Sequence, residues 1–286
     1  MVALFAMRAH AGIDAMIEAV ENSQVLFPRT DSDVPFMPMG WATYSYYGDA
    51  DFGGGGISGN FREQQGSLGG VLPVYAKDKN ILFAGLDAEY TDFHVTTSMQ
   101  NDMDLWALTP LVADIHQLGD KTQIGGFAAP TFTSALNGGT PWNTGAFIGV
   151  LGAYYPNDRL AWFYGGVYQY SFGQNYLYPY LGFNWVLNKH WNICMIVPWP
   201  SIQYAPNDRV FFSLGATANG ADFNAREDGR QASVVYGNYN LMASVGVRLH
   251  KYLWLTAGVA RPVFAVCRLI VPVQISILPL KAVPFL

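Results

Sequence analysis

The sequence contains few ionic side chains. Only 13% of its 286 residues are Asp, Glu, Lys or Arg, against roughly 25% in an ordinary soluble domain. The net charge of −5 is spread along the chain without a block of one sign, so no nucleic-acid partner is expected. A soluble fold of this size needs a charged outer surface, and this chain has little material for one.

Cysteines and long apolar runs are also scarce. Cys194 and Cys267 are the only cysteines, too few for a disulfide framework or a zinc site. We expect both to be small buried apolar residues, and we expect no cofactor or metal. No run of about 20 mostly apolar residues is present, which a transmembrane helix would need.

In the middle third of the chain, charged residues occur only at short boundaries. No Asp, Glu, Lys or Arg occurs at 124–157, and none occurs at 160–188. The tetrapeptide Pro-Asn-Asp-Arg occurs at 156–159 and again at 206–209, between aromatic-rich runs. Pro suits the second position of a tight turn, and Asn and Asp can hydrogen-bond the local backbone. Each tetrapeptide therefore predicts a hairpin turn with Pro at its second position.

Short polar turns alternate with longer connections rich in Gly, Asn and Ser. The remaining short turns are expected at 77–80, 119–122, 188–190 and 250–252, and the longer connections at 52–66, 96–103, 137–143 and 219–231. Pro198-Trp199-Pro200 is expected to reverse the chain between two short strands. Short turns at one end and longer loops at the other are typical of an up-and-down barrel.

The segments between these turns alternate with a period of two. Leu82, Leu86 and Tyr90 share one face of a predicted strand, while Asp87 and Glu89 share the other. Such strands exceed the usual length of about five or six residues and match the roughly 9–11 that a tilted strand needs to cross a bilayer. The pattern predicts an all-β fold, an up-and-down antiparallel transmembrane β-barrel of about 12–14 strands with an imperfect last strand.

Four charged residues are expected to face the lumen of this barrel: Asp87, Glu89, Arg209 and Arg248. An ionised Arg or Lys facing lipid at mid-membrane would cost about 2–4 kcal/mol, and an acid somewhat less. Two interpretations stay open at this point. The charges form an internal ion-pair network that rigidifies the barrel, or they line a pore and bias its ion selectivity.

One group of residues is the candidate for catalysis. His94 follows Asp92 by two residues, and Ser98 lies beyond the predicted strand end. A Ser/His/acid set of this kind would suit an outer-membrane lipid hydrolase. Because Ser98 is only a loop neighbour, we expect no enzyme. A lipid-modifying hydrolase and a soluble all-β binding protein are kept as alternatives.

Aromatic residues cluster near the predicted strand ends, as in the girdles of membrane barrels: Tyr154, Tyr155, Trp162, Trp185, Trp191, Tyr204, Tyr252 and Trp254. The stretch VPWPSIQYAPNDRVFFSLG at 197–215 is similar to a P-x-P-x-I-x-Y-x-P strand pair of a barrel family without an assigned activity. Over 40–265 the chain thus resembles bacterial outer-membrane β-barrel proteins of an uncharacterised, porin-like family.

The resemblance implies a place in the outer membrane of a Gram-negative envelope. It implies contact with membrane lipid and lipopolysaccharide, insertion by the barrel-assembly machinery, and strands around a polar lumen. A passive pore for the transport of small solutes, or a structural envelope protein, is the function expected from it.

Three regions are expected. Residues 1–38 form an N-terminal lead, which is a signal remnant, a short helix or a disordered segment. Residues 39–265 form the transmembrane barrel. Residues 266–286 lose the alternation and carry Pro272, Pro279 and Pro284, so we expect a truncated or frame-shifted closing strand there.

Overall fold

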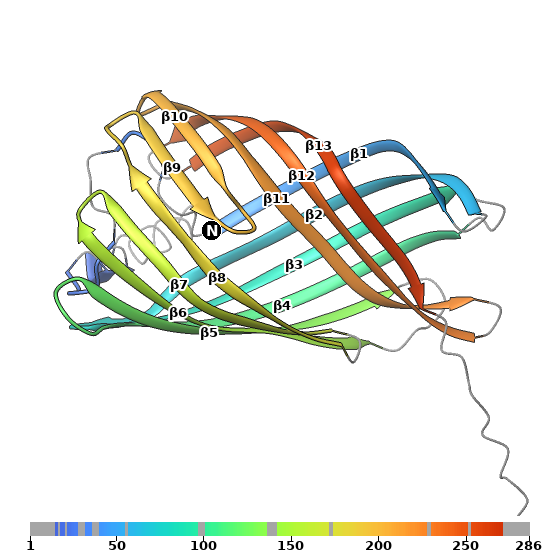
Figure 1. Ribbon diagram of the computed structural model, residues 1–286, viewed down its shortest axis with the longest axis horizontal. Coiled ribbons are helices and arrows are strands. Elements are labelled where there is room, and N and C mark those ends of the chain that lie inside the picture. Colours follow the sequence, from blue (N-terminus) through green and yellow to red (C-terminus); the bar gives the residue numbers. More distant parts are fainter. Residues whose placement is uncertain are drawn as a thin grey trace, which may run out of the picture.

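The described residues of the computed structural model form one antiparallel sheet of 13 strands, each paired with its neighbours in the sequence. The sheet curls into a tube (Figure 1). The description covers residues 15–16, 18–20, 22–27, 32–35, 40–54, 57–96, 101–135, 142–171, 174–227, 230–250 and 253–270. The predicted all-β, up-and-down antiparallel fold is confirmed, and 13 strands lie within the predicted number.

The strands follow one another around the tube. They are β1 (Gly40–Gly54), β2 (Ile57–Lys77), β3 (Asn80–Thr96), β4 (Asn101–Gln117), β5 (Thr122–Ala135), β6 (Asn143–Asn157), β7 (Leu160–Ser171), β8 (Gln174–Val186), β9 (Trp191–Ile196), β10 (Ser201–Asn207), β11 (Val210–Glu227), β12 (Arg230–His250) and β13 (Leu253–Ile270). Within the described part of the chain, β1 and β13 are not hydrogen-bonded to each other. The sheet therefore keeps two edges.

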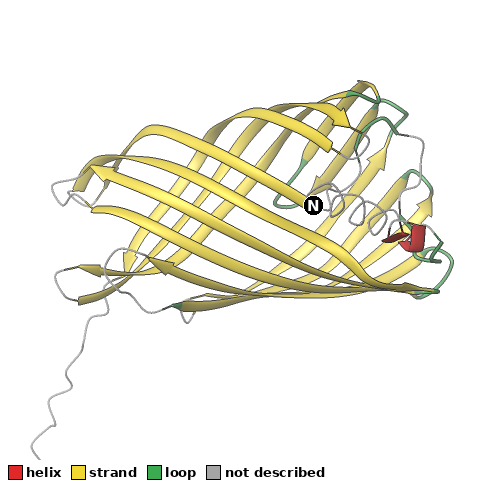
Figure 2. Cartoon of the chain, turned by 180° about the vertical axis from the view of Figure 1, so that it is seen from behind, coloured by secondary structure: helices red, strands yellow, loops and turns green. Residues whose placement is uncertain are grey.

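Almost all of the structure is strand (Figure 2). Helical residues occur at 15–16 and 18–20, before the first strand. Among the residues described here, no helix has the length and apolar character needed to cross a membrane.

The predicted short turns lie together at one end of the tube, which we call the short-turn end. Turns join β2 to β3, β4 to β5, β6 to β7, β8 to β9 and β10 to β11 close to the predicted positions. The predicted turn at 250–252 falls largely outside the described residues. The reversal around Pro198-Trp199-Pro200 is confirmed, because β9 and β10 are two short strands that pair with each other.

The position of proline in the repeated tetrapeptide differs from the prediction. Asn157 pairs with Leu160, so the two turn residues are Asp158 and Arg159. Pro156 precedes Asn157 and lies within a register shift of the ladder, and the second copy is arranged in the same way. A bulge tolerates proline because the missing N–H is not needed there. The side chain of Asn157 does act as predicted, accepting a hydrogen bond from the Arg159 N–H at 2.9 Å.

Two predicted long connections are largely strand instead. β1 reaches Gly54 and β2 begins at Ile57, while β11 reaches Glu227 and β12 begins at Arg230. The Gly- and Asn-rich composition of 52–66 and 219–231 suggested loops. An unbroken antiparallel partner satisfies the backbone of 219–227, and this pairing overrides the low strand propensity. β13 also extends to Ile270, past the predicted limit at 265, and 271–286 lie outside the described residues.

The two faces of the sheet differ as the alternation predicts. In β3, Leu86 and Tyr90 are exposed on the outer face, whereas Thr91 and Phe93 are buried on the inner face. The same phase holds in β12, where Leu241 is 54% exposed and its neighbour Asn240 is fully buried. The leucines therefore point away from the tube, and no second sheet covers them in the described residues.

Most of the predicted girdle aromatics also lie on the outer face. Tyr154, Trp162, Trp185 and Trp191 are exposed there, close to the short turns. Tyr155 and Trp254 are exceptions. Tyr155 is buried inside the tube and its hydroxyl group donates a hydrogen bond to Gln123, and Trp254 packs against Phe211 on the inner face. Tyr252 lies outside the described residues.

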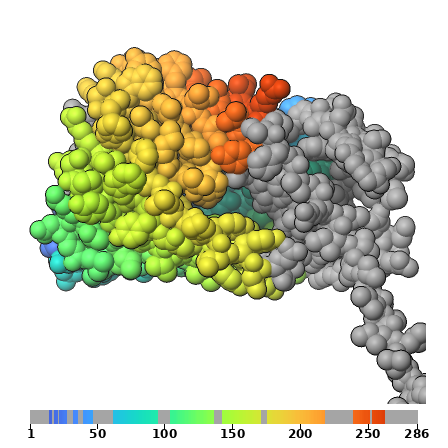
Figure 3. Space-filling view, viewed as in Figure 1, coloured from blue at the N-terminus to red at the C-terminus, as the bar shows by residue number. Residues whose placement is uncertain are grey.

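The wall of the tube has an uneven height. β9 and β10 contain six and seven residues, against 21 in β2 and in β12. In the described residues, β8 pairs with β9 only over 182–186, and the pairing of β11 with β10 ends at Gly215. Atoms with the colour of β2 and β3 are visible between β8 and β11 in the space-filling view (Figure 3). The wall is therefore lowest above the β9–β10 hairpin.

Candidate functional site: the inner wall and the short-turn mouth

A row of carboxylates lies on the inner wall of β2 and β3. The indole Nε1 of Trp41 donates a hydrogen bond to Asp87 Oδ1 at 2.8 Å, reaching across Gly69 of the intervening strand. A Cβ atom at Gly69 would lie 2.5 Å from Asp87 Oδ1 and 2.6 Å from the Trp41 ring. Glycine at this position is what allows the contact between β1 and β3.

Glu89 lies two residues further along the same face and is also held by neutral groups. Thr91 Oγ1 donates a hydrogen bond to Glu89 Oε1 at 3.4 Å, and the side chain of Gln65 hydrogen-bonds the same carboxylate. Gln65 is in turn fixed by Ser45 Oγ, which donates to its Oε1 at 3.3 Å. Glu63, 2% exposed, adds a third carboxyl group to this face.

These partners bear on the two interpretations of the inner charges. The contacts found for Asp87 and Glu89 come from neutral donors of Trp, Gln and Thr side chains. The ion pairs found within the described residues involve Asp33 and Asp208, both at the short-turn end. Among the described residues, the contacts that hold these two acids are therefore hydrogen bonds from neutral groups and not a cross-lumen ion-pair network.

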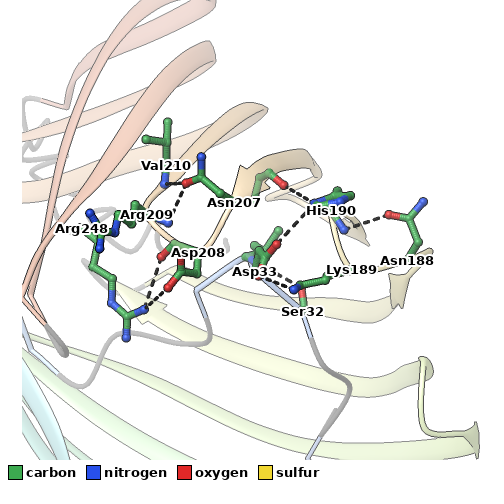
Figure 4. Close-up of polar contacts among 12 residues, drawn as sticks. Ser32, Asp33, Asn188, Lys189, His190, Asn207, Asp208, Arg209, Val210 and Arg248 are labelled. Atoms are coloured by element: carbon green, nitrogen blue, oxygen red, sulfur yellow. Dashed lines mark hydrogen bonds and ion pairs between the residues drawn. The ribbon is translucent and has the colours of Figure 1, made fainter.

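The two predicted lumen arginines differ from each other (Figure 4). Arg248 lies on the inner face of β12, with its Nη1 3.4 Å from Asp208 Oδ2 and its guanidinium group 5.9 Å from the centre of the Trp254 ring. Arg209 does not lie on a strand face. It is an exposed residue of the two-residue β10–β11 turn, and the turn removes it from the strand alternation.

Two of the candidate catalytic residues, Asp92 and His94, lie on the opposite side of the wall. Asp92 and His94 alternate with the buried Thr91 and Phe93, which places both on the outer face of β3. Asp92 is paired with Asp104 of β4. Ser98 lies outside the described residues, so whether the three lie together is not tested and the hydrolase stays a prediction.

Sequence reasoning missed a pair of glutamines inside the short-turn mouth. Gln117 ends β4, Gln123 is near the start of β5, and each is 4% exposed. The Leu26 N–H donates a hydrogen bond to Gln117 Oε1 at 3.1 Å, and Gln123 Nε2 donates to the Leu26 carbonyl at 2.6 Å. The two glutamines are also linked to each other at 2.9 Å. We call this pair the glutamine clamp.

Apolar side chains of the N-terminal segment pack against the inner wall next to the clamp. Leu26 packs against a cluster of Ala153, Tyr155 and Ala161 on β6 and β7. Val34 packs with Ala205, Phe211 and Trp254 on β10, β11 and β13. All of these wall residues belong to the inner face or its rim, so the segment lies inside the mouth.

An acidic residue connects the segment to the β8–β9 turn (Figure 4). The Asp33 N–H donates to the Lys189 carbonyl at 2.8 Å. Its carboxylate lies 3.7 Å from Lys189 Nζ and 3.4 Å from His190 Nδ1. The Asp33 side chain is only 9% exposed, so these contacts hold a buried carboxylate at the rim. We call Asp33, Lys189 and His190 the aspartate latch.

The prediction for the cysteines is only partly testable here. Cys194 is partly exposed on the inner face of β9, opposite Ser201, instead of fully buried. The side chain of Cys267 lies outside the described residues. A cluster of three or more His, Cys, Asp or Glu residues suited to a metal ion is not found in the part of the chain that the structure describes.

A comparison of the chain with protein-family models finds no matching family, and a comparison with curated proteins finds no match. What the structure shows is a single antiparallel sheet of 13 strands, which is compatible with a β-barrel.

Proposed function

We propose that this chain is a β-barrel of a bacterial outer membrane and that it acts as a passive, cation-preferring pore for small polar solutes. The observation that carries the proposal is the exposure of large aliphatic side chains on the outer face: Leu177 and Val259 are each 76% exposed, and Leu68 is 68% exposed. Removing one such side chain from water is worth about 1.5–3 kcal/mol. Contact of these side chains with the hydrocarbon of a bilayer removes them from water, so an exposed aliphatic face is favourable in a membrane.

Strand length and aromatic placement support the same proposal. Every strand except β9 and β10 has at least 12 residues, more than the roughly 9–11 that a tilted strand needs to cross a bilayer. On β7, the exposed Trp162 lies near the short turn and the exposed Tyr170 near the other end. The eight-residue step between them covers about 26 Å along the strand. With a tilt of about 35–45° this is about 20 Å of height, which is comparable with an apolar band about 25 Å tall between two girdles.

The preference for cations follows from the inner wall. Asp87 and Glu89 place carboxyl groups on one stretch of β3, and the partners found for both are neutral. Acidic side chains on a pore wall attract cations and repel anions. Small hydrated cations and neutral polar solutes are therefore the proposed cargo.

Reversal potentials in planar bilayers test this proposal. In a potassium chloride gradient we expect a cation-selective current, with selectivity reduced by the pair of substitutions Asp87→Asn and Glu89→Gln. Asp114→Asn is the matched control, because Asp114 lies exposed on the outer face of β4 near the short turns. Heat-modifiable migration on a gel confirms that each protein is folded. Anion selectivity, or equal effects of inner and outer substitutions, would contradict the proposal.

A closed structural barrel of the envelope is the second candidate. Cα atoms of β5 and β11, strands from distant parts of the sheet, approach within 8 Å of each other, which narrows the tube. A folded, inserted protein that carries no current, both as the full chain and without residues 1–35, would favour this structural role over the pore.

A further inference from the structure

The N-terminal segment contacts wall residues next to almost every short turn. Gln24 donates its N–H to the Asp78 carbonyl of the β2–β3 turn at 2.7 Å. Leu26 is held by the clamp on β4 and β5 and packs on β6 and β7. Asp33 meets the β8–β9 turn, and Val34 packs on β10, β11 and β13. A segment with partners on all these sides lies across the mouth and not along one strand.

The glutamine clamp binds the backbone of the N-terminal segment and not its side chains. Gln117 and Gln123 together satisfy the N–H and the carbonyl of one residue, Leu26, much as a neighbouring β-strand would. Both amides are almost fully buried while the segment is in place. Buried amides left without partners are unfavourable, so this arrangement requires a peptide backbone in the mouth or water that replaces it.

The N-terminal segment has two further kinds of contact with the barrel: buried apolar side chains, and the polar contacts of the aspartate latch. Val25 is completely buried and Val34 is 8% exposed, so the apolar contacts favour the docked state. In the latch, the side chains of Lys189 and His190 are 55% and 46% exposed. Because the Lys189 ammonium is more than half exposed, salt screens its ion pair with Asp33. The nitrogen of His190 that faces Asp33 also hydrogen-bonds the Ala205 carbonyl at 2.8 Å. The segment is therefore docked specifically, yet its rim attachment can be broken.

We infer that the N-terminal segment, described at 22–27 and 32–35, is a plug, and that the short-turn mouth is its docking site, so that the pore stays closed until the segment is released. The inference rests on the proposed pore function, since only a conducting barrel has a current for the plug to block. Release exposes the clamp to water and removes the barrier at one end of the lumen.

The first test uses the full chain with the clamp removed by Gln117→Ala and Gln123→Ala. Two hydrogen bonds to the plug are lost, so we expect the open probability in planar bilayers to rise by about tenfold or more. Gln203→Ala is the matched control, because Gln203 is also a glutamine of the inner face, bonded to Asn192 at 3.0 Å. The control should leave the open probability unchanged.

The second measurement does not depend on conduction. In a chain carrying Cys267→Ser, a charged, membrane-impermeant maleimide is added at the short-turn side, and its reaction with Cys194 on the inner face of β9 is timed. Removal of the clamp should accelerate this labelling by about the same factor as the open probability, and Gln203→Ala should not. A synthetic peptide of residues 18–38 should slow the labelling again in a chain lacking 1–35, and a scrambled peptide should not.

The outcomes separate the plug from the pore. Faster labelling without any current supports the plug and rejects the pore. A current in every variant, with no change in labelling or open probability when the clamp is removed, overturns the plug and leaves the pore. A rise in current without faster labelling also overturns the plug, because the mouth is then not the part that changed.

Discussion

The substitution of an exposed leucine by lysine distinguishes hydrocarbon from water at the outer face. Leu181, on β8, is 65% exposed, and Leu253, the first residue of β13, is 55% exposed. In water, either change would alter the free energy of unfolding by no more than about 0.5 kcal/mol, as at most surface positions. In a bilayer, the effect depends on depth.

The depth of each leucine in a bilayer follows from its distance to the short turns. Six residues separate Leu181 from Leu187 of the β8–β9 turn, which is about 20 Å along a strand. With a tilt of about 35–45°, Leu181 lies about 15 Å from the rim, near the middle of an apolar band about 25 Å tall. Leu253 directly follows a short turn and lies at the rim. We expect Leu181→Lys to cost about 2–4 kcal/mol and Leu253→Lys about 0–1 kcal/mol.

The assay is equilibrium unfolding by guanidinium in phosphatidylcholine vesicles, with the folded fraction read from heat-modifiable migration on a gel. Leu181→Ala serves as a further control for the loss of side-chain volume. Equal, near-zero effects of the two lysines would refute the reasoning, because they would show that water surrounds both positions.

Three further predictions concern the inner wall, the turns and the latch. Gly69→Ala should lower the free energy of unfolding by about 1–3 kcal/mol through overpacking, while Gly66→Ala on the same strand, whose Cβ would meet its nearest atom at 3.9 Å, should cost less than half as much. Asn207→Ala removes the acceptor for the Arg209 and Val210 N–H groups and should cost about 0.5–1.5 kcal/mol in the same unfolding assay, with equal stability contradicting the turn geometry. Raising the salt concentration should increase the open probability by screening the latch, and Asp33→Asn should abolish this salt dependence in bilayer recordings.

Local sequence patterns were sufficient to predict the repeated strand-turn units. Polar turns such as the one at 77–80 and the alternation around Asp87 and Glu89 are encoded within a few residues, because the two faces of a strand meet different surroundings. The same reasoning placed Arg248 on the inner face, and it failed for Arg209 because a two-residue turn interrupts the alternation. The extent of β11 and β12 depended on pairing between partner strands, which their Gly- and Asn-rich composition concealed.

The mouth could not be predicted because its contacts join distant parts of the chain. Leu26 meets Gln117 and Gln123 across more than 90 positions of sequence. The only local signal was a pair of glutamines at inward-facing positions on either side of the short turn at 119–122. The phase of the strands would have directed both glutamines into the lumen, but nothing nearby in the sequence identified Leu26 as their partner.

The central claim is that hydrocarbon contacts the outer face of these strands and water the inner face. A nitroxide scan along 240–247 of β12, in a chain with Cys194→Ser and Cys267→Ser and reconstituted in vesicles, tests it most directly. We predict that collisions with oxygen are most frequent at Leu241, Ala243 and Val245, and that collisions with a water-soluble nickel complex are most frequent at the residues between them, with a period of two. If the nickel complex reaches outer and inner positions equally, water surrounds both faces and the claim is wrong.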